Sequence, residues 1–123
     1  QTVGGRLLLA LLPPLGIGEE VERRELEAAF AVQAEGLIAG GSDVLLIETC
    51  QDPLQIKAAV NGCRHAFVRR GVELPLMVQV TIETTGSMLV GTDIAAATVI
   101  VDALGVPVMG LNCATGPKEM AEH

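Results

Sequence analysis

Four apolar runs recur along the chain, and each of the first three is followed by a segment with helical periodicity. The runs lie at residues 6–12, 43–48, 75–81 and 107–112, so successive runs start roughly 32 to 37 residues apart. That period is the length of a βαβ unit, in which a helix connects two parallel strands. The runs are rich in Val, Leu and Ile, as is typical of strands buried on both faces. The pattern therefore predicts an α/β fold with a parallel sheet.

The segments between the runs carry stripes with the spacing of an α-helix. The first helix is predicted over about residues 19–38, the second after the N-cap Asp52 and Pro53, and the third from about Asp93. The members of the three stripes are spaced by three or four residues: Leu26, Phe30, Gln33 and Leu37; Ile56, Val60, Cys63 and Phe67; and Ile94, Thr98, Val101 and Leu104. A further helix is expected to start at Gly116-Pro117.

Two parallel architectures accommodate four such strands, a doubly wound sheet and a (β/α)₈ barrel. A barrel usually needs about 250 residues, so the 123 residues here would form about half of one. The chain begins without Met near a predicted strand and stops inside a predicted helix. We therefore expect residues 1–123 to be the central fragment of a barrel domain, with each strand beside the next in chain order.

Composition argues against several classes of function. Fifteen acidic and eight basic residues give a net charge of −7, and only 2% of the residues are aromatic. Neither feature suits binding to nucleic acid or to an anionic membrane surface. The longest apolar stretch ends at Pro13-Pro14, which is too short to span a bilayer, and the first residues lack the pattern of a signal peptide. Three cysteines do not form a disulfide framework, so reduced thiols and a cytoplasmic location are expected.

Polar residues follow three of the runs, where parallel α/β proteins place their chemistry. These residues are Glu48, Thr49 and Cys50; Thr81, Glu83 and Thr84; and Asn112 and Cys113. Glu48 would bind an ammonium group or act as a base, or else cap the next helix or pair with an arginine. Cys113 precedes a helix start that favours a thiolate, which suits a nucleophile or metal ligand, although a structural thiol is the alternative. Cys63 falls on a helix stripe and is expected in the core, whereas Cys50 has no evident partner.

Three segments carry a resemblance to a known family. They are Leu-Leu-Ile-Glu-Thr at residues 45–49 with Asp52, residues 79–86 with Met88-Leu89, and above all Gly-Leu-Asn-Cys-Ala-Thr-Gly-Pro at residues 110–117. The chain resembles the homocysteine S-methyltransferase family, most closely the homocysteine-binding barrel of its cobalamin-dependent methionine synthase branch. The resemblance implies a (β/α)₈ barrel in which three cysteines hold zinc. The zinc binds the homocysteine sulfur, and methyl transfer to that sulfur gives methionine.

The resemblance also implies roles for individual residues. Cys113 would be the first zinc ligand, Glu48 would hold the substrate's amino group, and Asn112 would shape the substrate site on the same rim. The other two cysteine ligands of the family lie later in the barrel, and Cys50 and Cys63 do not occupy their positions. The chain alone is therefore expected to be inactive.

Other parts of the parent enzyme are implied as well. Cobalamin and methyltetrahydrofolate would bind to modules outside this chain. Two alternatives stay open: a family member that uses betaine or S-methylmethionine as the methyl donor, and a non-catalytic α/β binding module of flavodoxin type.

Overall fold

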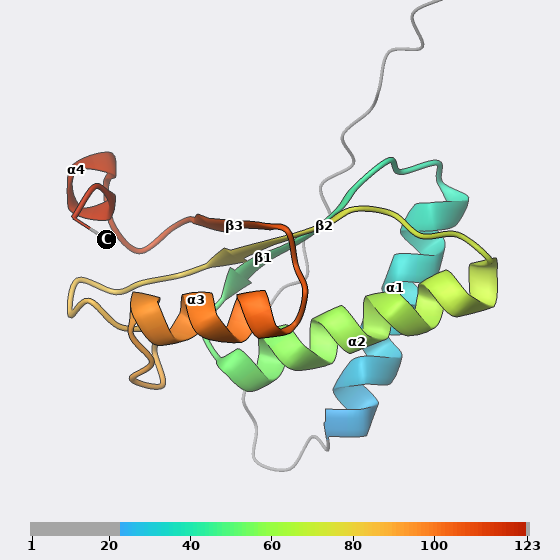
Figure 1. The fold of residues 1–123 in the computed structure, drawn as a ribbon, viewed down its shortest axis with the longest axis horizontal. Coiled ribbons are helices and arrows are strands. Elements are labelled where there is room, and N and C mark those ends of the chain that lie inside the picture. Colours follow the sequence, from blue (N-terminus) through green and yellow to red (C-terminus); the bar gives the residue numbers. More distant parts are fainter. Residues whose placement is uncertain (1–22, 123) are drawn as a thin grey trace, which may run out of the picture.

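In a computed structural model of the chain, residues 23–122 are described, and helices alternate with strands along them. The elements are α1 (Arg23–Ala39), β1 (Leu45–Cys50), α2 (Pro53–Arg70), β2 (Leu76–Val80), α3 (Ile94–Ala103), β3 (Val108–Leu111) and α4 (Pro117–Met120) (Figure 1). The strand predicted at residues 6–12 and the beginning of the first predicted helix lie outside the described residues. Within residues 23–122, no helix is both long and apolar enough to cross a membrane.

The three strands form one parallel sheet in the order β1-β2-β3. In its register, Ile47 lies beside Val78, and Val78 lies beside Met109. The α/β class, the parallel pairing and the chain-order arrangement are thus confirmed for the described strands. Such a sheet is consistent with part of a barrel.

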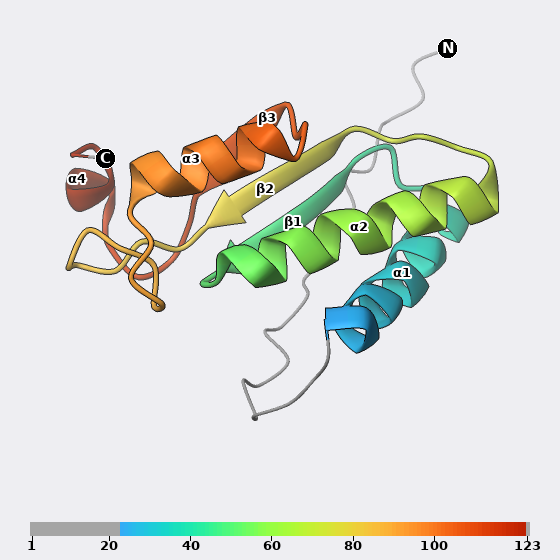
Figure 2. The ribbon, with the colours of Figure 1, turned by 60° about the horizontal axis from the view of Figure 1, so that its bottom comes forward.

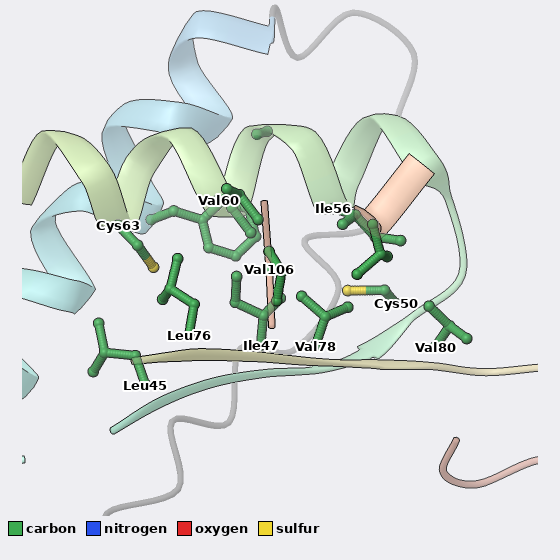
Figure 3. Packing of buried hydrophobic residues seen from close by; sticks show 14 of the residues in the cluster. Leu45, Ile47, Cys50, Ile56, Val60, Cys63, Leu76, Val78, Val80 and Val106 are labelled. Atoms are coloured by element: carbon green, nitrogen blue, oxygen red, sulfur yellow. The ribbon is translucent and has the colours of Figure 1, made fainter. Parts of the chain in front are cut away.

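Helix α2 runs along one face of the sheet (Figure 3). Its predicted stripe is confirmed, because Ile56, Val60, Cys63 and Phe67 are all buried. They pack in one cluster with the strand residues Leu45, Ile47, Leu76, Val78 and Val80. The helix begins as predicted at Asp52, whose Oδ1 accepts a hydrogen bond from Leu54 N at 2.8 Å. It ends at Gly71, which adopts a left-handed φ of 64° that glycine tolerates without strain.

Helix α1 crosses α2 at close range (Figure 2). A Cβ atom at Gly62 of α2 would lie 2.6 Å from the Cβ of Phe30 and 2.7 Å from the carbonyl oxygen of Glu27. Only glycine therefore fits at this crossing. The Nδ2 of Asn61 donates a hydrogen bond to Glu27 Oε1 at 3.0 Å, and Arg69 pairs with Glu35 at 2.9 Å.

For one residue of the stripe predicted on α3, the prediction of a buried position is wrong. Thr98 is exposed, and its hydroxyl donates a 2.8 Å hydrogen bond to the carbonyl of Ile94 one turn earlier. The buried face instead carries Ala97 and Val101. Ala97 and Val101 lie three and seven residues after Ile94, so the three side chains fall on one side of the helix. Thr98 is rotated from Ala97 by about 100° around the helix axis.

Candidate functional site

The carboxyl ends of the three strands lie together at one end of the sheet, beside the loop after β2 and helix α4 (Figure 1). Backbone hydrogen bonds extend the ladder past the last strand residues. Thr81 N donates to Cys50 O at 2.9 Å, and Asn112 N donates to Val80 O at 3.2 Å. Residues just beyond β2 and β3 are therefore held in fixed positions relative to the end of β1. We call this end of the sheet the strand-end site.

A bulge near the end of β1 changes which side chains reach the strand-end site. Ile47 pairs with Val78 and Cys50 with Val80, so three steps along β1 match two steps along β2. Both Ile47 and Cys50 pack in the core against the helices. The two residues between them, Glu48 and Thr49, are thereby released from that face. Thr49 has a φ of 57°, a left-handed conformation that is costly for a β-branched residue.

Three side chains from the three strand ends form a hydrogen-bonded network. The Nδ2 of Asn112 donates to Thr49 Oγ1 at 2.7 Å, and the hydroxyl of Thr81 donates to Asn112 Oδ1 at 3.3 Å. Thr81 is only 2% exposed. The Asn112 carboxamide is thus held from both sides, with its nitrogen toward β1 and its oxygen toward β2.

Cys113 follows this network directly and is exposed. Its Sγ lies 3.4 Å from Asn112 Nδ2 and 3.9 Å from Thr49 Oγ1. Cys113 and Ala114 both have left-handed φ values, 58° and 49°, so the chain turns sharply after β3. The structure therefore places the thiol at the strand-end site and not in the core between sheet and helices.

Glu48 is 9% exposed, and its Oε1 has no hydrogen-bond partner among the described residues. The two structural roles considered for it are filled by others. Asp52 caps α2, and the ion pairs formed among residues 23–122 use Glu27 and Glu35 as their acids. A buried polar atom without a partner costs about 1–3 kcal/mol. The Glu48 carboxylate is therefore available to accept a hydrogen bond from a ligand.

The other two cysteines belong to the core. Cys50 is 1% and Cys63 is 4% exposed. Burial raises the pKa of each thiol to about 12, and the Asp52 carboxylate adds to the effect at Cys50. The expectation for Cys63 is confirmed, and Cys50 plays the same part. In the described part of the chain, no three His, Cys, Asp or Glu side chains lie together as a metal site would require.

Thr49 and Thr81 are strand-end residues for which the sequence alone indicates no role. Their position after apolar runs is visible in the sequence. Their joint contact with Asn112 depends on the β1 bulge, which no sequence signal marked.

Comparison with known proteins gives consistent matches. Residues 5–123 match the family model described as homocysteine S-methyltransferase. The methionine synthases of Mycobacterium leprae and Mycobacterium tuberculosis are each 52% identical to this chain over 112 residues. Those residues make up 91% of this chain but 9% of either relative, so the chain spans less than a tenth of the curated relatives it matches.

Proposed function

Because the chain belongs to the homocysteine S-methyltransferase family, we propose that it forms part of an enzyme that transfers a methyl group to the homocysteine thiol and yields methionine. Residues 1–123 would be a central part of a homocysteine-binding (β/α)₈ barrel domain. The parallel sheet in chain order and the helix α2 along one face support that architecture. The observation that carries the proposal is the strand-end site, where an exposed thiol follows β3 and a partnerless carboxylate oxygen lies on β1.

Cys113 is proposed as a zinc ligand. Thiolates are common zinc ligands, and a catalytic zinc needs about three protein ligands and one open position. Cys113 meets the requirement for one ligand, since its thiol is free, exposed and beside an amide donor. The remaining ligands would come from outside the described residues. A free thiol has a pKa of about 8.5 and is mostly protonated at neutral pH. When bound, zinc would keep the homocysteine sulfur deprotonated.

Glu48 is proposed to bind the ammonium group of homocysteine. Its carboxylate oxygen is buried without a partner, so an ammonium N–H would satisfy it at the strand-end site. A charge-assisted hydrogen bond of this kind fixes the amino end of the substrate. Asn112, immobilised by Thr49 and Thr81, would shape the wall between the amino group and the thiol.

The methyl donor would reach this barrel from elsewhere in the parent protein. Both relatives are named methionine synthase, and the matched segment is a small fraction of their length. We extend the proposal accordingly to other modules that bind cobalamin and methyltetrahydrofolate. The 52% identity to methionine synthases favours a cobalamin-borne methyl group over betaine or S-methylmethionine as the methyl donor.

Zinc titration of the full-length protein tests the proposal. Wild type should bind one zinc tightly, and Cys113→Ala should lose both tight zinc binding and methyl transfer to homocysteine. Cys63→Ala is the matched control, because it removes a thiol from the core and should cost stability while leaving zinc stoichiometry unchanged. Tight zinc binding or unchanged activity in Cys113→Ala would contradict the assignment.

A further inference from the structure

The Thr49 hydroxyl lies near both the Asn112 amide nitrogen and the Cys113 sulfur, and the amide nitrogen is the nearer of the two. We propose that Thr49 is a positioning residue for Cys113: its hydroxyl holds the Asn112 carboxamide so that an amide N–H points at the Cys113 sulfur. This inference rests on the proposed function, in which that sulfur is a metal ligand. It adds a role for a residue that itself binds neither zinc nor substrate.

The hydrogen bonds form a directional chain. The Thr81 hydroxyl donates to Asn112 Oδ1, and Asn112 Nδ2 donates to Thr49 Oγ1 at 2.7 Å. The amide nitrogen carries two hydrogens, so the second is available to Cys113 Sγ at 3.4 Å. Thr49 Oγ1 lies farther from the same sulfur, at 3.9 Å. The shorter individual contacts from the Thr49 hydroxyl to the sulfur therefore run through the Asn112 amide.

The amide orientation decides whether an N–H or a carbonyl oxygen faces the Cys113 sulfur. A flipped Asn112 would turn its carbonyl oxygen toward Thr49 and the sulfur, and two electron-rich atoms would then face one another. With the Asn112 nitrogen toward β1, Thr49 is the acceptor at the short 2.7 Å distance. Loss of the Thr49 hydroxyl would remove that acceptor and leave the amide oriented by the longer contacts with Thr81 Oγ1 at 3.3 Å and Cys113 Sγ at 3.4 Å.

The backbone supports the same role. Thr49 holds a φ of 57° inside the β1 bulge, a left-handed conformation that is unfavourable for a β-branched residue. Residues in such conformations are concentrated at functional sites. Partners that hydrogen-bond to a metal ligand typically change metal affinity by about 10–100-fold when they are lost.

The test uses the full-length protein with zinc as the probe. Thr49→Val keeps the β-branched shape and removes the hydroxyl, whereas Thr49→Ser keeps the hydroxyl. Zinc affinity, measured by competition with a chromophoric chelator, should fall about 10–100-fold in Thr49→Val and stay near wild type in Thr49→Ser. The thiolate-to-metal absorption of the cobalt(II)-substituted protein should shift in Thr49→Val alone. Thr98→Val is the matched control, since it removes an exposed threonine hydroxyl from α3 and should change neither measurement.

A double variant tests whether Thr49 acts through Asn112. If it does, Thr49→Val combined with Asn112→Ala should lose no more zinc affinity than Asn112→Ala alone, because coupled residues are not additive. Additive losses would overturn the inference. Thr49→Ala, which carries one branch less at the strained φ, takes the place of Thr49→Val should circular dichroism show that the valine variant fails to fold.

The outcomes separate this inference from the proposed function. Tight zinc in Cys113→Ala would overturn both. Loss of zinc in Cys113→Ala, together with wild-type affinity and cobalt spectrum in Thr49→Val, would overturn only the role of Thr49.

Discussion

The crossing of α1 and α2 at Gly62 gives a stability prediction with a matched control. A methyl group there would lie 2.6 Å from Phe30 Cβ and 2.7 Å from the Glu27 carbonyl oxygen, whereas carbon atoms in contact lie about 3.5–4.0 Å apart. The helices would have to separate by about 1 Å, and overpacking costs about 1–3 kcal/mol. Alanine regains about 0.5–1 kcal/mol over glycine in a helix. We therefore expect Gly62→Ala to lower the free energy of unfolding by about 1 kcal/mol, the difference between the midpoints of these two ranges.

Gly36 in α1 is the control, because a Cβ there would meet no heavy atom within 4 Å. Gly36→Ala should raise the free energy of unfolding by about 0.5–1 kcal/mol through helix propensity alone. Urea unfolding of the complete domain that contains this chain, followed by circular dichroism, measures both changes as shifts of the midpoint at constant slope. A midpoint for Gly62→Ala equal to or above wild type would refute the close crossing. A loss of stability in both variants would refute the assignment of the Gly62 effect to the crossing.

Three further predictions concern the strand-end site and the thiols. Glu48→Gln should weaken homocysteine binding by about 10–100-fold in calorimetric titration of the full-length protein, since a hydrogen bond to a charged group contributes about 1.5–3 kcal/mol. Iodoacetamide at pH 8 should modify Cys113 in the folded protein stripped of zinc, with Cys50 and Cys63 modified only after denaturation, as mass spectrometry would show. The pKa of both core thiols rises from 9.0 to about 12 on folding. Their neutral form therefore contributes stability in full below pH 9, and that contribution should fall as pH rises from about 9 to 12; Cys63→Ala should reduce the slope of unfolding free energy against pH over that interval.

The fold could be read from the sequence where one rule acted alone. The runs at residues 43–48, 75–81 and 107–112 form strands, and the stripe of Ile56, Val60 and Cys63 is buried, as periodicity predicts. The Asp52 cap depends only on local chemistry and is confirmed too. The prediction for Thr98 is wrong because steps of four and three from Ile94 lead to Val101 through Thr98, while steps of three and four lead there through Ala97, and periodicity alone fits both.

The strand-end site could be predicted only in part. Parallel strands bring their carboxyl ends together, so Glu48, Asn112 and Cys113 could be chosen by their positions after apolar runs. The left-handed backbone of Thr49 and the shifted pairing of β1 arise from contacts between segments far apart in sequence. Local sequence rules contain no term for those contacts, which is why the link from Thr49 to Asn112 came from the structure alone.

The extra residue in β1 also makes the core packing of the strand independent of the polar side chains at its end. In a regular strand, side chains alternate between the two faces of the sheet, so two adjacent residues cannot both point away from the core. A second polar residue there would require the whole strand to shift its register. Here Ile47 and Cys50 keep their contacts in the apolar cluster, while the two residues between them lie outside that cluster. Deleting Thr49 would restore a regular strand with the same packing against α2. Insertions, deletions or substitutions at the bulge can therefore change the side chains at this end of β1 while Ile47 and Cys50 keep their packing against α2.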